Sequence, residues 1–68
     1  MSINEMIDSE LKKVKAYYSE YEIEKRFYGK NYVNDNKDKF DCIAQLEYHL
    51  TLLILLVELR ERREKENE

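Results

Sequence analysis

The segment Leu50–Leu59, with the sequence LTLLILLVEL, limits most strongly what this chain can fold into. Between Leu50 and Val57 only Thr51 is polar. If these residues form an α-helix, apolar side chains project from almost its whole circumference, and such a helix has to be covered on more than one side. The run is also far shorter than the ~20 apolar residues that span a bilayer. We therefore expect a core helix and no membrane segment.

A first helix is predicted from residue 3 to about residue 28. Ser2 and Glu5 have the spacing of a capping box, in which each side chain bonds the backbone of the other residue. Apolar residues then recur in steps of three and four, the period of an amphipathic helix. They are Ile7, Leu11, Val14, Tyr18, Tyr21 and Tyr28. The chain has no proline, and we expect its single glycine, Gly29, to end the helix in the left-handed conformation.

Residues 29–37 are predicted to form a loop, because Asn and Asp are frequent there and favour turns. The candidates for the N-cap of a second helix are Asp35, Asn36 and Asp38. That helix is predicted from about residue 37 to residue 65. Two helices of nearly equal length joined by a short loop fold as an antiparallel hairpin, so we expect one all-α domain over residues 1–68.

The first helix can cover only one side of the leucine-rich segment, so the hairpin alone would leave an apolar patch of the kind found at interfaces. A two-fold dimer is the commonest closed assembly, and it would convert two hairpins into a four-helix bundle. A tetramer or a complex with another chain are the alternatives. The residues predicted at the oligomer interface are Ile43, Leu46, Leu50, Leu52, Leu53, Leu56 and Val57.

In outline this layout is similar to that of the Rop family of plasmid copy-number regulators, whose short helical hairpins pair into four-helix bundles. The resemblance lies in the topology of the whole chain. It transfers no RNA-binding residue to a position of this sequence.

The residues that could carry chemistry are few. Cys42 is the only cysteine and His49 the only histidine, so there is no intrachain disulfide and no Cys/His metal motif. Residues 34–45 hint at a calcium loop, but Lys39 stands where glycine is needed and Gln45 where a bidentate glutamate is needed. We therefore expect no metal, no cofactor and no enzymatic activity. Without an apparent signal peptide, the expected location is the cytoplasm.

Two sets of residues are candidates for binding a macromolecule. Ile23 and Phe27 form an apolar pair away from the main seam of the first helix, and Tyr17 and Tyr32 are further candidates for a protein contact. Lys12, Lys15, Arg26 and Lys30 project within about 60° of one another and could follow a phosphate backbone. The formal net charge of −3, and Glu22 one turn before Arg26, favour a self-paired surface instead.

The sequence therefore predicts a small, non-enzymatic regulator or adaptor that self-associates through its leucine-rich helix and binds another protein. The alternative is a nucleic-acid-binding four-helix bundle that uses the basic line on the first helix.

Overall fold

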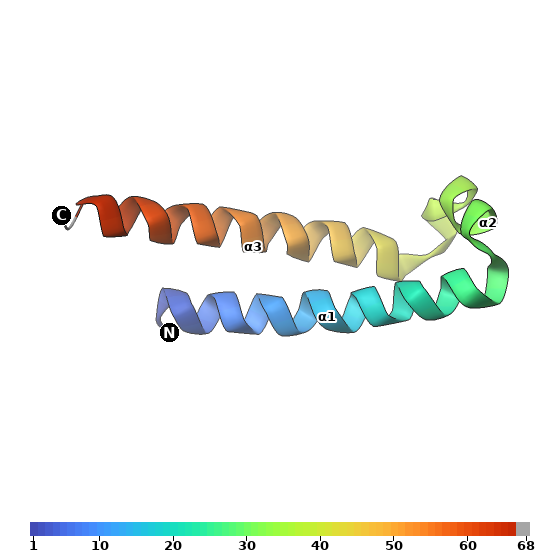
Figure 1. Ribbon diagram of the computed structural model, residues 1–68, viewed down its shortest axis with the longest axis horizontal. Helices are drawn as coiled ribbons and strands as arrows, with labels where there is room; N and C mark the ends of the chain where they lie inside the picture. Colours follow the sequence, from blue (N-terminus) through green and yellow to red (C-terminus); the bar gives the residue numbers. More distant parts are fainter. Residues whose placement is uncertain (67–68) are drawn as a thin grey trace.

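The computed structural model describes residues 1–66, which form two long antiparallel helices joined by a short helical connection (Figure 1). The long helices are α1, Ile3–Tyr28, and α3, Asp41–Glu66, each of 26 residues. Between them lie α2, Lys30–Asp35, and η1, a 3₁₀ turn over Lys37–Lys39. The described residues contain no strand, and they extend over 49 × 18 × 14 Å. The predicted all-helical hairpin, with its two long helices packed together, is confirmed.

Both ends of α1 follow from local chemistry. Ser2 is the N-cap, and its hydroxyl accepts a 3.1 Å hydrogen bond from the Glu5 backbone N–H. At the other end Gly29 donates its N–H to the Lys25 carbonyl. Gly29 has φ 91° and ψ 147°, so it is not in the predicted left-handed helical conformation. This extended, positive-φ conformation is open almost only to glycine, and it turns the chain directly from α1 into α2.

The predicted loop at residues 29–37 is wrong, because most of it is the helix α2. The reason is tertiary packing. Val33 is the one apolar residue in the middle of this Asn- and Asp-rich segment, and it is completely buried against Cys42 and Ile43. A helical turn buries this side chain while the polar neighbours face water, and that burial overrides the turn preference of the Asn and Asp residues.

As a consequence α3 begins at Asp41, later than predicted. Phe40, in an extended conformation with φ −115° and ψ 101°, separates η1 from α3. Its carbonyl accepts a 3.1 Å bond from the Ile43 N–H. Phe40 also packs against the buried cluster, so the entry into α3 is fixed by an apolar side chain. The three residues predicted as candidates for the N-cap of this helix all lie before Phe40, so none of them stands directly before α3. They are Asp35, Asn36 and Asp38.

The two long helices meet along rows of residues spaced alternately by four and three, as in coiled coils. The row on α1 is Ile3, Ile7, Glu10, Val14, Tyr17, Tyr21 and Glu24, and all seven are buried or half-buried. The row on α3 is Cys42, Leu46, His49, Leu53, Leu56 and Arg60, also buried or half-buried. We call these two rows the seam. Glu10 and Tyr17 take the places predicted for Leu11 and Tyr18, which are exposed instead.

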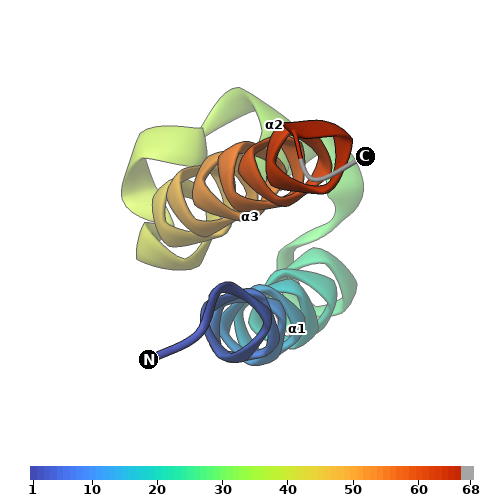
Figure 2. The same ribbon diagram turned by 90° about the vertical axis from the view of Figure 1, so that its left-hand side faces the viewer.

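The best-packed part of the molecule lies at the end where the chain turns. The buried residues Val33, Cys42 and Ile43 form one cluster there, with the partly buried rings of Tyr17 and Tyr21 against it. Elsewhere in residues 1–66 only Ile7 is buried to the same degree. Figure 2, viewed from the end where both termini lie, shows α3 resting on α1 alone, with α2 at the far end. The C-terminal half of α3 is thus covered along one side only.

The structure adds one finding to the membrane question. By length and composition α3 could cross a bilayer. The apolar stretch that matters is an 18-residue window of the helix with a mean hydropathy of 1.6, which is longer than the run Leu50–Val57 considered above. Core helices of soluble proteins pass the same test, but such helices are mostly buried, and only 11% of this window is buried inside the hairpin. Composition alone therefore does not assign α3 to either environment.

Candidate functional site

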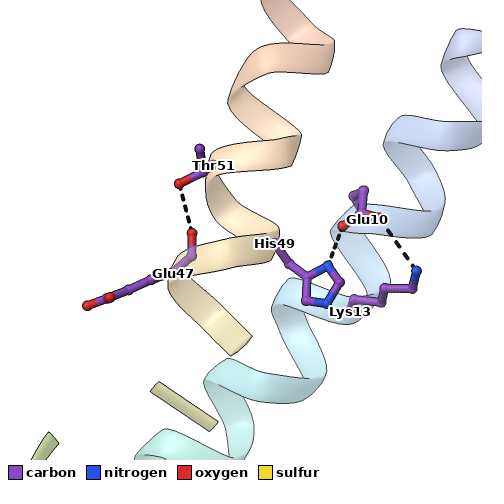
Figure 3. Close-up of polar contacts among 5 residues, drawn as sticks. All are labelled: Glu10, Lys13, Glu47, His49 and Thr51. Carbon is purple, nitrogen blue, oxygen red and sulfur yellow. Dashed lines mark hydrogen bonds and ion pairs between the residues drawn. The ribbon is translucent and has the colours of Figure 1, made fainter. Parts of the chain in front are cut away.

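A carboxylate and an imidazole meet inside the seam (Figure 3). The Nδ1 atom of His49 on α3 lies 2.6 Å from Oε2 of Glu10 on α1, and the two side chains are only 13% and 14% exposed. Since a carboxylate can only accept, the imidazole Nδ1–H is the donor. Within residues 1–66 one other side-chain bond joins the long helices, the exposed 3.3 Å bond from Arg60 to Asn4.

The surroundings hold this pair in place. The ring of Tyr17 stacks on the imidazole, with centroids 5.5 Å apart and 8° between the planes. Lys13 Nζ lies 3.5 Å from Oε1 of Glu10 on the solvent side. Burial raises the pKa of Glu10, but the hydrogen bond from His49 and the charge of Lys13 outweigh it and hold the pKa below its ordinary value of 4.5. Glu10 is therefore ionised at neutral pH.

The Glu10–His49 pair has the composition of an acid–base dyad, but its setting fits a structural role. No nucleophilic side chain bonds to it, and residues 1–66 enclose no pocket next to it. The same residues contain no cluster of three potential metal ligands. A polar pair at facing seam positions disfavours any register that would bury either group alone. The contact of these two side chains joins α1 to α3 at one register.

Cys42, the other reactive residue type in the chain, is buried at the turn end of the seam. Burial raises the pKa of its thiol, and the negative charges of Glu20 and Glu24 raise it further. A thiol that is protonated and shielded in this way is a poor nucleophile. Cys42 thus serves as a small apolar side chain of the core.

The residues predicted at the oligomer interface fall into three groups in the hairpin. Leu46, Leu53 and Leu56 lie in the seam against α1, and Ile43 is covered by Val33. Leu50, Leu52 and Val57 lie beside the seam, and Leu50 is exposed. Four further apolar or aromatic residues of α3 outside the predicted set are also exposed, namely Tyr48, Ile54, Leu55 and Leu59. Thr51, the polar residue in this run, donates its hydroxyl to the Glu47 carbonyl of its own helix (Figure 3).

The four candidates for a protein contact separate in the structure. Ile23 and Phe27 lie one turn apart on α1 and are 64% and 81% exposed. Tyr32 is exposed at the turn, where its ring stacks on Tyr28 with centroids 5.5 Å apart. Tyr17 is different, since it is half-buried in the seam and stacked on His49. The accessible candidates are therefore Ile23, Phe27 and Tyr32.

The predicted basic line differs from expectation in its extent and in its partners, because Lys30 is the first residue of α2 and only the other three cations lie on α1. Lys12, Lys15, Arg26 and Lys30 are all exposed, and no ion pair involves any of them within residues 1–66. The expected pairing of Glu22 with Arg26 is absent from those residues. Glu22 binds Lys25 instead, at 3.0 Å, while Lys25 also lies over the ring of Tyr21. The expected ion pairs of these four cations are therefore not formed in the described residues, although the charge of Arg26 contributes to lowering the pKa of Glu22.

Comparison of the chain with protein-family models, with curated proteins and with solved structures finds no match.

Proposed function

We propose that the protein is a small, non-enzymatic regulator or adaptor that self-associates through α3 and binds another protein. The observation that carries the proposal is the apolar surface that the hairpin leaves open on α3. Leu50, Ile54, Leu55 and Leu59 are 42%, 52%, 55% and 41% exposed. Several large apolar side chains exposed on one helix are characteristic of interaction sites.

Self-association is tested first by sedimentation equilibrium of the purified chain over a range of concentrations. The expected result is a mass of twice the 8.4 kDa chain, or a larger multiple, that falls on dilution. Ile54→Glu is the perturbing variant, because it places a charge on the apolar surface that α3 leaves exposed and leaves the seam between α1 and α3 unchanged. A wild-type chain that stays a folded, soluble monomer at all concentrations would refute self-association.

The contact with a second protein is assigned to Ile23 and Phe27, because both are large apolar side chains that the hairpin leaves exposed. Immobilised wild-type protein should capture a specific protein from a lysate of the source cells, and Ile23→Ser with Phe27→Ser should abolish the capture. The matched control is Lys12→Glu with Arg26→Glu on the same helix, which should leave the capture unchanged.

The alternative function, nucleic-acid binding, is favoured by one observation, the absence of ion pairs from the basic line within residues 1–66. A mixed pool of RNA and DNA oligonucleotides would then raise the sedimenting mass in low salt. Such binding falls steeply as salt rises, because each neutralised phosphate releases a counterion. Binding that is lost on Lys12→Glu with Arg26→Glu would establish this alternative and displace the adaptor.

A further inference from the structure

We propose that the hairpin binds copies of itself on both of its broad sides. One of them, called the Leu50 side, carries Leu11 and Tyr18 of α1 with Leu50, Ile54 and Val57 of α3. The other, called the Leu55 side, carries Met6 and Phe27 of α1 with Tyr48, Leu55 and Leu59 of α3. Each side pairs with the same side of another copy, so the assembly continues beyond a dimer. The inference rests on the self-association in the proposed function and adds to it the number of surfaces used.

The two broad sides follow from helix geometry. Figure 1 looks straight onto one of them, with α1 and α3 lying next to each other. At about 100° per residue, the residues that define the Leu50 side lie to one side of the seam on α3, and those that define the Leu55 side lie to the other. In an antiparallel pair, turning away from the seam in the same sense on both helices leads to the same side of the hairpin. The residues of α1 divide between the two sides in the same way.

Both sides expose large apolar or aromatic side chains on both long helices. On the Leu50 side, Tyr18 of α1 and Ile54 of α3 are each 52% exposed. On the Leu55 side, Phe27 of α1 is 81% exposed and Leu55 of α3 is 55% exposed. Only 11% of the apolar 18-residue window of α3 is buried inside the hairpin, because α1 covers α3 along the seam alone. A single copy bound to one side would therefore leave the apolar residues of the other side in water.

The charged residues give no reason to leave one side out. Each side has a lysine in its row on α1, Lys25 on the Leu50 side and Lys13 on the Leu55 side. Both lysines already bind a glutamate of their own helix, at 3.0 and 3.5 Å respectively. Glu20 is a further exposed charge on the Leu55 side, and it is opposite in sign to Lys13, which stands seven residues before it. A copy on either side therefore has to cover charged groups of α1.

The outer edges of the hairpin, which are the surfaces of α1 and α3 opposite the seam, favour a protein layer over lipid as the cover. The edge of α3 exposes Glu47, Thr51 and Glu58, and the edge of α1 exposes Asp8 and Lys12. Copies packed on the broad sides leave both edges in water. A bilayer that surrounded α3 would bury its two carboxylates, which is unfavourable. Apolar sides combined with polar edges thus fit layers of hairpins.

The dimensions of a broad side fit a second copy of the chain. The side extends over 49 × 18 Å, an area of about 880 Å², and a standard interface buries about 800 Å² on each partner. The two long helices have 26 residues each, so a copy related by a two-fold axis covers the side along its full length. Each side is therefore large enough for one interface of standard size.

The contact assigned to the second protein lies mostly outside these interfaces. Ile23 is on the outer edge of α1, and Phe27 lies where that edge meets the Leu55 side. Ile23 is 64% exposed in the hairpin. An assembly of stacked hairpins would therefore present Ile23 along its edge, once in every copy.

Glutamate substitutions block one side at a time. Ile54→Glu acts on the Leu50 side and Leu55→Glu on the Leu55 side, at positions that are 52% and 55% exposed. Leu50→Glu and Leu59→Glu, at positions that are 42% and 41% exposed, repeat the test once on each side. Thr51→Glu is the control, because it adds the same charge on the outer edge of α3. Sedimentation equilibrium over a range of concentrations measures the mass. Circular dichroism measures the helix content, and a variant that loses helix is replaced by the second variant of its side.

The wild type should form species larger than twice the 8.4 kDa chain as its concentration rises, and Thr51→Glu should do the same. Every variant with one blocked side should stop at the dimer, because its other side still pairs. The double variant Ile54→Glu with Leu55→Glu should remain a monomer at concentrations at least about 30-fold above those at which the single variants dimerise, the size of a hot-spot effect.

A wild type that stops at the dimer would overturn the use of both sides, and so would a variant on either side that keeps the mass of the wild type. Single variants that are monomeric would also overturn it, because neither side would then pair without the other.

Two other outcomes separate this inference from the function on which it rests. A wild type that is monomeric at every concentration would refute self-association itself, whichever side is altered. Phosphatidylcholine–phosphatidylglycerol vesicles test for lipid as the occupant. If the wild type floats with them and the double variant does not, lipid covers the two sides and the proposal is overturned.

Discussion

Replacing Glu10 and His49 with leucine, singly and together, tests the role of the pair in the seam. The two groups are 2.6 Å apart and only 14% and 13% exposed, so removing one leaves the other mostly out of water without its partner. That desolvation penalty is about 1–3 kcal/mol for each single variant. Replacing a buried polar pair with apolar residues of similar volume is neutral or stabilising by about 1–4 kcal/mol. The double variant should therefore be at least as stable as the wild type.

The assay is urea unfolding followed by circular dichroism at neutral pH. All proteins are compared at one concentration, because self-association contributes to the measured free energy of unfolding. Glu24→Leu is the matched control. Glu24 stands fourteen residues after Glu10 in the same row of the seam, and no side-chain hydrogen bond joins it to another residue within residues 1–66. Its replacement should not lower the free energy of unfolding.

The reasoning is refuted if the two single changes are additive within about 0.5 kcal/mol, because residues in contact should show a coupling energy above that level. It is also refuted if the double variant is the least stable of the set. Either result would mean that the pair is not what aligns α1 with α3.

Four further predictions concern single residues. Because the pKa of Glu10 is lowered in the folded protein, its carboxylate stabilises the fold fully above about pH 4.5, and this contribution is lost as the pH falls through the folded-state pKa. In Glu10→Gln the free energy of unfolding should therefore depend less on pH in the acid range. Gly29→Ala should lower the free energy of unfolding by about 1–3 kcal/mol in urea titrations, because alanine resists φ 91°, and equal stability would contradict this. Cys42 should react with a thiol reagent far more slowly in the native protein than in urea, and equal rates would show that the cluster at the turn is open. Leu53→Asp should cost more than about 3 kcal/mol in the same titrations, with a near-neutral result arguing against its place in the seam.

Local signals were enough to predict the long helices. The capping box at Ser2, the absence of proline and the glycine at position 29 give α1 bounds that agree with the structure. The start of α3 was not predictable in the same way. It depends on the burial of Val33 against a cluster whose other members come from α3, and composition within the connection gives no sign of that contact.

The Glu10–His49 pair was missed for a related reason. Choosing the most apolar residue at each step favours Leu11 and Tyr18, whereas the helix as packed turns Glu10 and Tyr17 inward. A strict alternation of four and three from Ile3 leads to Glu10 and Tyr17, so the phase of the repeat was the signal that could have found the pair. That a carboxylate is tolerated there depends on a histidine thirty-nine residues away, which no local pattern encodes.

The hairpin is packed more closely at the turn than at the end where the termini lie, so local unfolding should begin at the termini. Val33, Cys42 and Ile43 hold the turn end together, while toward the termini only Ile7 is buried to the same degree within residues 1–66. The two long helices should then separate first at the end where the termini lie. Amide hydrogen exchange should accordingly be fastest in the last turns of α3 and slowest beside Cys42. A second copy bound to the middle of α3 would hold the two long helices together next to the place where they begin to separate. Association of two chains and closing of the hairpin would then be coupled in one equilibrium.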